Sequence, residues 1–544
     1  MKKSLLIFVI ALVSILSYSQ KDKKFQNPSS PGSIDMGLST NVFYLSANGA
    51  ISDADIGINS MTFGTDNTSA IQNVLDKAKS NPIIVYWDGK YSVTGLKVYS
   101  NTKIIAFEGC GAILRNNSDK HLLENGNMSS SSYGNSNISI WGGIWNGNGF
   151  NDDLNPAQIH DNPQVGWICT FCFLGVENLS IKDVVIYKPR TFALNTCNVR
   201  NIFIQNVRVD VGESAPINCD GLHINGPSEN IIIKDCIIRA KDDHISIQAD
   251  YAKDNHRPLF GDNDVGNTYG DITDVTIDNI KLEGGLFGIR LLSRENLIDK
   301  IRISNIHGIT KEYWLIVDNY FQGEPRVTNP GKGKFGTIII EDINVESTGR
   351  FVSFTVNNSY ANIHANVECI VFKTINRNSY NDDNFPSILV TGEGRTVKKL
   401  IIEGYNASES TVLASKTSNH IEINGARVKY LSISNSNVTR DHPANSSPLL
   451  CVKNEGYVDC LQLDNIYCDG INNIVDVQGA ISLISATNII HMNATEGEGT
   501  FKAAGKITIP DLVLTNYTGV LPTSGEGTFV KTRGDGFTKS SVLK

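Results

Sequence analysis

Proline, methionine and an excess of positive charge are what this sequence of 544 residues lacks. It has 16 prolines and 5 methionines, and 56 Asp and Glu outnumber 48 Lys and Arg, for a net charge of −8. Nucleic-acid-binding proteins are usually basic, so we predict no nucleic-acid partner. Glycine is frequent, with 47 residues, and this composition favours many short strands joined by turns over long helices.

Long apolar runs are also missing, apart from one at the N-terminus. Lys2 and Lys3 precede an apolar run over residues 5–16, and small or polar residues follow to Gln20. This arrangement is typical of a cleaved secretory signal peptide, here residues 1–20. The run is shorter than the roughly 20 residues that span a bilayer, and no cysteine follows it as in a lipoprotein. We therefore predict a secreted or periplasmic protein without membrane contact after cleavage.

A repeated pattern runs through most of the chain. Each copy has alternating apolar residues, then Asn or Asp, then a second apolar pair. The Asn or Asp positions are spaced by 206 − 183 = 23, 235 − 206 = 29 and 305 − 279 = 26 residues. Period-two alternation indicates strands, and repeats of this length indicate a solenoid whose stacked coils bury one continuous core. Clear copies occupy residues 178–184, 201–207, 230–236, 274–280, 300–306 and 337–343.

We therefore predict an all-β fold, a right-handed parallel β-helix. Asn and Asp at its bends are expected to hydrogen-bond to the backbone or to neighbours in adjacent coils. The first end of a solenoid needs a cap, because open strand edges aggregate. Residues 69–78 predict a capping helix, with Thr68 as its N-cap and an apolar stripe of Ile71, Val74 and Leu75.

The predicted domains follow from where the repeat ends. The pattern remains legible to about residue 490, and the chain beyond it is rich in turn-forming residues. After the signal peptide we predict a β-helix catalytic domain over residues 21–495. Residues 496–544 are predicted to form a C-terminal cap or extension.

The ten cysteines allow disulfides in an oxidising compartment, but the sequence leaves their pairing open. Cys169 and Cys172 form a CxxC pair, and no second CxxC or HxxxH follows it. Because a zinc site needs such partners, packing as small core residues is the favoured interpretation. No calcium-loop spacing is present. We predict no metal site and no cofactor.

Several motifs resemble glycoside hydrolase family 28, the polygalacturonase-like members of the pectin lyase-like β-helix superfamily. Residues 65–72 (TDNTSAIQ) resemble the superfamily's opening helix, and residues 137–149 (NISIWGGIWNGNG) resemble its glycine-rich coil. Residues 218–221 (NCDG) and 241–243 (KDD) are more specific, because they resemble the family's NTDG and GDD signatures in the right order. The resemblance covers roughly residues 40–300 and implies hydrolysis of a polysaccharide.

Asp220, Asp242 and Asp243 are the candidate catalytic residues. The spacing 242 − 220 = 22 is about one coil, so stacking brings the three carboxyl groups together on the outer wall. Glycosidic hydrolysis needs a protonated carboxyl for the leaving oxygen and an ionised carboxylate for water, and crowded carboxylates provide both. The resemblance implies that Asp242 is the general acid, that Asp220 and Asp243 hold and activate the water, and that the anomeric configuration inverts.

Side-chain alternation conflicts with this placement. Leu222 and Ile245 are expected to point inward, and strict alternation turns Asp220 and Asp243 inward as well, where an unpaired carboxylate is costly. We therefore expect these two aspartates at a strand start or a bulge, where alternation breaks.

Three further residues are predicted to bind substrate. His223 and His244 have outward parity beside the aspartates, so either can bind a sugar hydroxyl or tune a carboxylate. Arg290 stands where the family has its RIK arginine, but Leu292 replaces the lysine, and residues 284–292 lack the family's GHG histidine. Residues 268–291 also resemble a catalytic coil of family 82 iota-carrageenases, without the acidic pair of that family.

The predicted protein is thus a secreted glycoside hydrolase that acts on an acidic polysaccharide. Two other enzymes on the same fold are left open, a polysaccharide lyase and a carrageenan-type galactan hydrolase. A non-catalytic carbohydrate-binding or adhesive β-helix is a third alternative. The expected partner is the polysaccharide alone, and the expected oligomeric state is a monomer.

Overall fold

A computed structural model describes most of the chain, and the predicted signal peptide lies outside the part that it describes. The described residues are 41–149, 168–215, 218–250, 269–319, 333–347, 360–379, 386–409, 419–440, 448–492, 500–503, 508–509, 511–518, 528–529 and 532–533.

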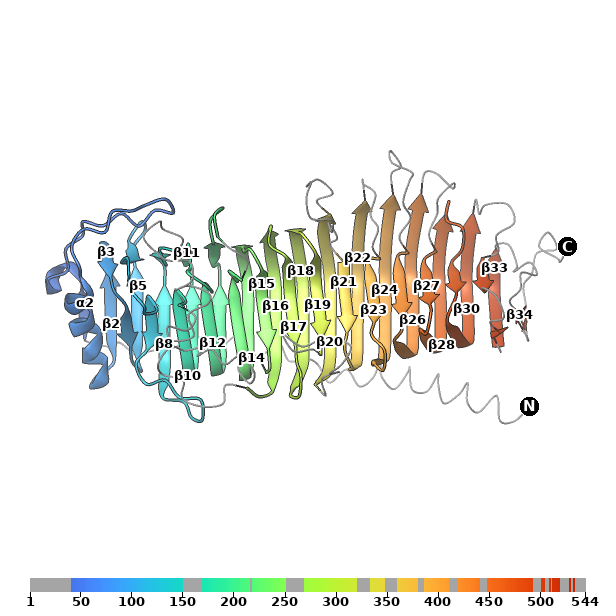
Figure 1. Ribbon diagram of the computed structural model, residues 1–544, viewed down its shortest axis with the longest axis horizontal. Helices are drawn as coiled ribbons and strands as arrows, with labels where there is room; N and C mark the ends of the chain where they lie inside the picture. The colour runs from blue at the N-terminus through green and yellow to red at the C-terminus, as the bar shows by residue number, and fades with distance from the viewer. Residues whose placement is uncertain are drawn as a thin grey trace.

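The chain winds into a right-handed parallel β-helix, a rod in which the strands of successive coils lie side by side (Figure 1). Strands pair with those one coil away, and the pairings are parallel, as the repeat predicts. The longest series of paired strands begins in the first coils and includes β8 (Asn135–Trp141), β10 (Phe171–Lys182), β12 (Leu194–Gln205), β14 (Leu222–Arg239), β16 (Ile272–Glu283), β18 (Leu297–Thr310), β20 (Lys334–Ser347), β22 (Val367–Ser379), β24 (Thr396–Glu409), β26 (Arg427–Arg440), β28 (Tyr457–Asp469) and β30 (Ala480–Met492).

Shorter strands form the other sides of the coils. One series begins with β4 (Leu96–Val98) and β7 (Leu123–Asn125), runs through the first residues of β10, β12 and β14, and continues with β15 (Asp243–Gln248), β17 (Phe287–Leu292), β19 (Tyr313–Asp318), β21 (Tyr360–His364), β23 (Ile388–Thr391), β25 (Ile421–Asn424), β27 (Leu450–Lys453), β29 (Val475–Val477) and β31 (Phe501–Ala503). Another contains β3 (Lys90–Val93), β6 (Gly111–Leu114), β9 (Ile144–Asn146), β11 (Val185–Tyr187) and β13 (Arg208–Asp210). The first coils also contain β1 (Val42–Tyr44), β2 (Ile83–Trp87) and β5 (Thr102–Ala106).

The core is a column of stacked aliphatic side chains. Ile224, Ile247, Leu291 and Val317 follow one another in register on four successive coils, and each is fully buried. Burying a side chain of this size stabilises the fold by about 1.5–3 kcal/mol relative to leaving it exposed. Because every coil adds such residues to the same column, the strands that could not be stable alone stabilise one another.

The predicted capping helix is present at the first end of the rod (Figure 1). Helix α2 (Thr68–Leu75) continues into a 3-10 turn, η2 (Asp76–Lys79), and its apolar stripe is buried as predicted. The predicted N-cap, Thr68, is wrong: the cap position is Asn67, and Thr68 is the first helical residue. At this end of the helix, the Asp66 carboxylate accepts a hydrogen bond from the Thr68 amide at 2.9 Å. In the described ranges no helix is long and apolar enough to cross a membrane.

Asn and Asp at the bends form hydrogen-bonded ladders, as the sequence predicts. The amide of each ladder residue donates to the previous coil, for example from Asn178 to Asn137 at 2.9 Å and from Asn201 to Asn178 at 2.8 Å. These residues have left-handed backbone angles, with φ of 62° at Asn178 and 58° at Asn201. Asn tolerates this conformation better than most residues, which explains its recurrence.

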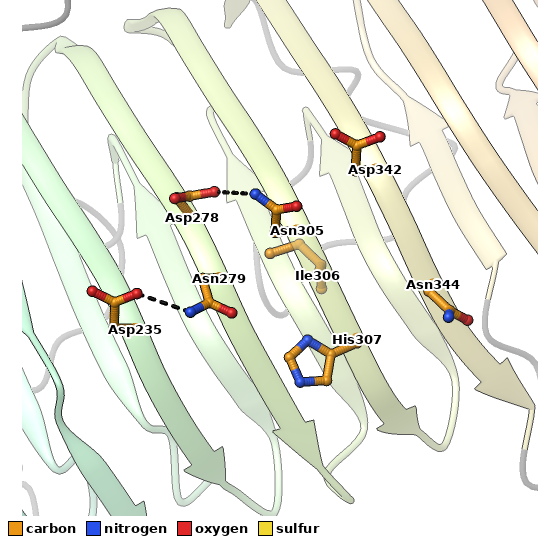
Figure 2. Close-up of a pocket in the computed structure, with 8 residues that line it drawn as sticks. All are labelled: Asp235, Asp278, Asn279, Asn305, Ile306, His307, Asp342 and Asn344. Carbon is orange, nitrogen blue, oxygen red and sulfur yellow. Dashed lines mark hydrogen bonds between the residues drawn. The ribbon is translucent and has the colours of Figure 1, made fainter.

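A second ladder lies at the next bend, on the outer wall of β14, β16, β18 and β20 (Figure 2). Asn279 donates to Asp235 at 2.8 Å, and Asn305 donates to Asp278 at 2.7 Å. The side chains line a shallow hollow of about 480 Å³. Asp235 is therefore a structural bend residue, as its place in the repeat indicates.

Strand pairing continues beyond the last clear repeat. Strand β33 (Asp511–Thr518) pairs in parallel with β30, and β35 (Thr532–Arg533) pairs with β33. Two further short strands, β32 (Thr508–Ile509) and β34 (Thr528–Phe529), pair with each other. This part of the chain thus extends the stack, although its sequence does not show the pattern clearly.

Candidate active site

The three candidate aspartates lie at the same turn of two successive coils. Asp220 precedes β14 by two residues, Asp242 directly precedes β15, and Asp243 is the first residue of β15. Leu222 of β14 is in register with Ile245 of β15, and the Gly221 amide donates to the carbonyl oxygen of Asp243 at 2.9 Å. The fold therefore brings the two signature motifs together across neighbouring coils.

The alternation of side chains breaks at the start of β15, as expected. Ile245 and Ile247 are fully buried in the core, so Ser246 between them faces outward. The Ser246 hydroxyl donates to the Asp243 carboxylate at 2.7 Å. The carboxylate of Asp243 consequently lies with the outward-facing side chains, although its sequence parity matches that of the core residues.

The three carboxyl groups are nearly buried instead of standing on an open wall. The exposed fractions are 4% for Asp220, 8% for Asp242 and 1% for Asp243. Burial, then the negative charges of Asp243 and Asp220, raises the pKa of Asp242 to about 9. Burial and then the charge of Asp243 raise the pKa of Asp220 well above its ordinary value. Asp242, the most accessible of the three, is therefore protonated at neutral pH.

His223 is the direct partner of Asp220. Its Nδ1 lies 2.8 Å from Asp220 Oδ2, and its ring stacks on Phe192 with 4.5 Å between ring centroids. Burial lowers the pKa of His223 to about 4, so the ring is neutral at pH 7. The structure thus places His223 beside one of the candidate carboxyl groups, and its tuning role stays a prediction.

Arg290 belongs to the same cluster. It is in register with Ser246 of the preceding coil, and its guanidinium lies 3.6 Å from Asp243 Oδ2. The guanidinium also lies near the Phe287 ring, 5.7 Å from the ring centroid. The guanidinium and the carboxyl group thus form an ion pair that is shielded from solvent. The structure thus brings Arg290 together with the aspartates.

His244 points away from Asp220 and toward the following coil. Its Nδ1 lies 2.6 Å from the Phe287 carbonyl oxygen, and the side chain is fully buried. Gly285, with φ of 77°, packs against this ring, and a Cβ there would lie 2.5 Å from His244 Cε1. The roles of His223, His244 and Arg290 in substrate binding stay predictions.

Two members of the cluster were not predicted from the sequence. Ser246 connects Asp243 to Gln248, whose amide donates to the Ser246 hydroxyl at 2.6 Å. Both residues have outward parity on the strand that begins with Asp243, and this signal could have identified them. Together they hold one oxygen of Asp243 in place.

One group of potential metal ligands emerges among the described residues, and it does not include the aspartates. His121, Cys169 and Cys172 have ligand atoms within 4.8 Å of one another. Acid–base hydrolysis by carboxyl groups requires no metal.

Fold and site together define a class of protein: a β-helix with carboxyl groups of unequal proton affinity, as glycoside hydrolases use. The family model "Glycosyl hydrolases family 28" matches residues 90–376, which is more than half of the chain. The chain therefore belongs to glycosyl hydrolases family 28. This result confirms the predicted family.

Curated relatives match over shorter stretches. An exopolygalacturonase of Zea mays is 27% identical over 141 residues, which are 24% of this chain and 34% of that protein. A polygalacturonase of Brassica napus is 32% identical over 126 residues, 21% of this chain and 31% of that protein. The matches thus span about a third of the length of these relatives.

Solved structures of similar fold share little sequence. A family 28 exopolygalacturonase of Yersinia enterocolitica has a TM-score of 0.38 and 13% identity, over 87% of this chain and 78% of that chain. The endo-xylogalacturonan hydrolase of Aspergillus tubingensis has a TM-score of 0.40 and 12% identity, over 91% of this chain and 100% of that chain.

Proposed function

We propose that this protein is a secreted, inverting glycoside hydrolase that cleaves a pectin-like, acidic polysaccharide. The observation that carries the proposal is the gathering of Asp220, Asp242 and Asp243 from two successive coils, with the most accessible of them protonated at neutral pH. Membership of the family supports hydrolysis of a glycosidic bond, and the polygalacturonases among the relatives support a pectin-like substrate.

Asp242 is the general acid of the proposed reaction. A leaving sugar oxygen needs a proton, and a carboxyl group whose pKa is about 9 still carries one at pH 7. Its exposed fraction is the largest of the three, which gives the glycosidic oxygen its best access there. As the bond between the anomeric carbon and this oxygen breaks, the proton of Asp242 moves to the oxygen.

Asp243 and Asp220 hold and activate the attacking water. Asp243 forms an ion pair with Arg290 and accepts a hydrogen bond from the Ser246 hydroxyl, and these contacts hold the group that takes a proton from water. Asp220 is oriented by its contact with His223. The water oxygen attacks the anomeric carbon from the face opposite the leaving group while its proton passes to the carboxylate of Asp243, so the product has inverted configuration.

The substrate and mechanism are tested by product analysis. The protein is incubated with polygalacturonate, methyl-esterified pectin, rhamnogalacturonan and iota-carrageenan, and new reducing ends are measured. We expect reducing ends from a pectic polymer, and proton NMR during the first turnovers is expected to show the inverted anomer. Absence of reducing ends from all pectic polymers contradicts the substrate, and a retained anomer contradicts the mechanism. An unsaturated, ultraviolet-absorbing product indicates a lyase instead.

Secretion is tested separately. The basic start and short apolar run of the N-terminus support a signal peptide that ends near Gln20. Expression of the full chain in a bacterial host, followed by N-terminal sequencing of the exported protein, is expected to show removal of about 20 residues. A protein that keeps Met1 and stays in the cytoplasm contradicts secretion.

A further inference from the structure

Two thiols and an imidazole meet in the coils just before the candidate active site. The ligand atoms of His121, Cys169 and Cys172 all lie within 4.8 Å of one another. The exposed fractions of these residues are 5%, 1% and 0%. All ten cysteines lie within the described residues and are in the thiol form, so neither of these two is in a disulfide.

The β-helix itself brings the three residues together. His121 lies two residues before β7, and 48 residues separate it from Cys169. Strand β10 pairs with β7, so that Cys172 is in register with Glu124. The Cys169 amide donates to His121 Nδ1 at 3.0 Å, which turns a lone pair of the imidazole toward Cys169. Strand pairing therefore brings the distant His121 to the local CxxC pair of Cys169 and Cys172.

The other buried cysteines of the described residues do not form such a group of three, although Cys468 is in register with His491. Cys236, for example, is 1% exposed in the main core and is in register with Ile280. Cysteines of this kind behave as small apolar residues. An imidazole buried beside two thiols has a cost that simple packing does not explain, because a polar ring loses hydration there.

The chemistry of the group selects a particular kind of ion. Thiolate sulfur and imidazole nitrogen are the preferred ligands of Zn²⁺, whereas Ca²⁺ and Mg²⁺ take oxygen ligands. Around a tetrahedral zinc at about 2.3 Å from sulfur and about 2.0 Å from nitrogen, ligand atoms stand about 3.5–3.8 Å apart. The ligand atoms lie within 4.8 Å of one another, so a contraction of at most about 1.3 Å brings them to this geometry.

The surroundings supply both an entry path and an apolar wall. His121 and Glu124 line a surface pocket of about 270 Å³ beside α2 and β4. On the other side, Cys169 and Cys172 pack with Leu174 and Phe192 in a small apolar cluster. An ion can therefore enter from the pocket, and apolar side chains shield the sulfurs from solvent.

We propose that His121, Cys169 and Cys172 form a structural Zn²⁺ site, with a water molecule from the pocket as the fourth ligand. On binding, the two thiols release their protons to solvent, and His121 Nδ1 exchanges the Cys169 amide for the ion. The site joins β7 to β10. Cys172 is in register with Asn195, and Asn195 is in register with His223, so the ion stabilises the strands that precede the aspartates. It is independent of the proposed hydrolase activity.

The first test is direct binding to the full chain, without a polyhistidine tag. Reduced protein is loaded with Zn²⁺, dialysed against metal-free buffer and analysed by mass spectrometry for elements. We expect about one zinc per chain. Replacement by Co²⁺ is expected to give a near-ultraviolet band of thiolate-to-cobalt charge transfer. Reduced protein that retains no zinc, or a cobalt complex without this band, overturns the site.

Variants locate the ion. His121→Ala and Cys172→Ser are expected to weaken zinc binding more than about 100-fold, beyond the loss of 10- to 100-fold typical of an outer partner of a metal site. Cys236→Ala, a matched buried cysteine outside the group, is expected to bind zinc as the parent protein does. Equal binding by the His121 and Cys172 variants overturns the assignment. So does a Cys169–Cys172 disulfide in the exported protein, found by intact mass and peptide mapping. Because the cobalt spectrum is recorded on the parent protein, a misfolded variant does not prevent a decision.

Discussion

Aspartates lie at coil bends in two places, the ladder on the outer wall and the candidate active site, and their surroundings differ. On the outer wall, Asp235 accepts hydrogen bonds from Asn279 at 2.8 Å and from Gln205 at 3.0 Å (Figure 2). At the candidate active site, Asp242 is nearly buried beside two other carboxyl groups, and its Oδ1 accepts no hydrogen bond. The hydrogen bond from Asn279 is the largest influence on Asp235 and lowers its pKa, whereas burial raises that of Asp242.

The difference shows that the same residue type at the same kind of bend can be structural or reactive. An exposed aspartate with amide donors is stable as an anion and ties coils together. A buried aspartate among like charges holds a proton that it can give away. Variants at the candidate active site or at the outer ladder change one set of bend residues at a time, so that the two sets can be compared within one protein.

Loss of the carboxyl group of Asp242 has the largest expected effect. Asp242→Asn removes the proton donor but keeps the shape of the side chain, so kcat is expected to fall by about 10²- to 10⁴-fold, the usual contribution of general acid–base catalysis. Reducing ends from the best pectic substrate provide the measurement. The control is Asp274→Asn, which removes an exposed carboxylate 3.1 Å from Lys300 and is expected to retain full activity. Equal activity in both variants removes Asp242 from the mechanism.

The second largest effect is expected in the pH dependence of the free energy of unfolding, to which Asp242 and Asp235 contribute with opposite sign. The folded pKa of Asp242 is about 9 and the unfolded value is 3.8, so folded protein binds this proton more tightly. Its contribution to stability is complete below about pH 4 and is lost as pH rises toward 9. Asp235 has a lowered pKa, so its contribution is present above about pH 4 and is lost as pH falls further.

Denaturation in urea at several pH values measures both contributions. In Asp242→Asn, the decline of unfolding free energy between pH 4 and pH 9 is expected to become shallower. In Asp235→Asn, the alkaline decline is expected to remain and the acidic decline to become shallower. A parent-like alkaline decline in Asp242→Asn contradicts the raised pKa.

A break in the outer ladder is expected to affect stability without affecting turnover. Asn279 has φ of 53° and donates to Asp235. In Asn279→Ala, the left-handed backbone carries Ala, which adopts this conformation less readily than Asn, at a cost of up to about 1–2 kcal/mol, and a hydrogen bond of about 0.5–1.5 kcal/mol is lost. Asn279→Gly removes only the hydrogen bond and is expected to lose less stability. Urea denaturation gives the free energies, and a loss of kcat in both variants would contradict a purely structural ladder.

The smallest effect is expected at His223, which is proposed to position Asp220 through one contact. One buried hydrogen bond contributes about 0.5–1.5 kcal/mol, so His223→Ala is expected to lower kcat by up to about tenfold and to shift the pH profile of kcat. His223→Gln keeps a hydrogen-bond donor and is expected to recover part of the lost kcat and part of the parent pH profile. His307→Ala alters an exposed histidine of the outer ladder hollow and serves as the control. An unchanged pH profile in His223→Ala contradicts the positioning role.

Much of the fold could be predicted because a solenoid repeats a local rule. Period-two alternation in residues 230–236 and 274–280 indicates strands, and both lie in the paired strands β14 and β16. The capping helix was predicted from the stripe of Ile71, Val74 and Leu75, whereas its N-cap was misplaced by one residue. Helix ends depend on which side chain happens to reach the first amides, here Asp66, and spacing alone does not specify that.

The candidate site could be predicted only in part. The two aspartate motifs are one coil apart, and this spacing was enough to bring Asp220 and Asp243 together. The sequence did not reveal that Arg290 and Ser246 both contact the Asp243 carboxyl group, because the position of Arg290 beside Ser246 depends on the register between β15 and β17. His121 was missed for the same reason: 48 residues separate it from Cys169, and the pairing of β7 with β10 brings them close.

By itself, the sequence determined the winding of the chain, since alternation and repeat length act within each coil and need no distant partner. Only the tertiary structure decided which acids are buried, which of them keep a proton, and which cysteines meet a histidine. Burial and charge at one side chain depend on neighbours from other coils, and the register between coils is a property of the assembled stack.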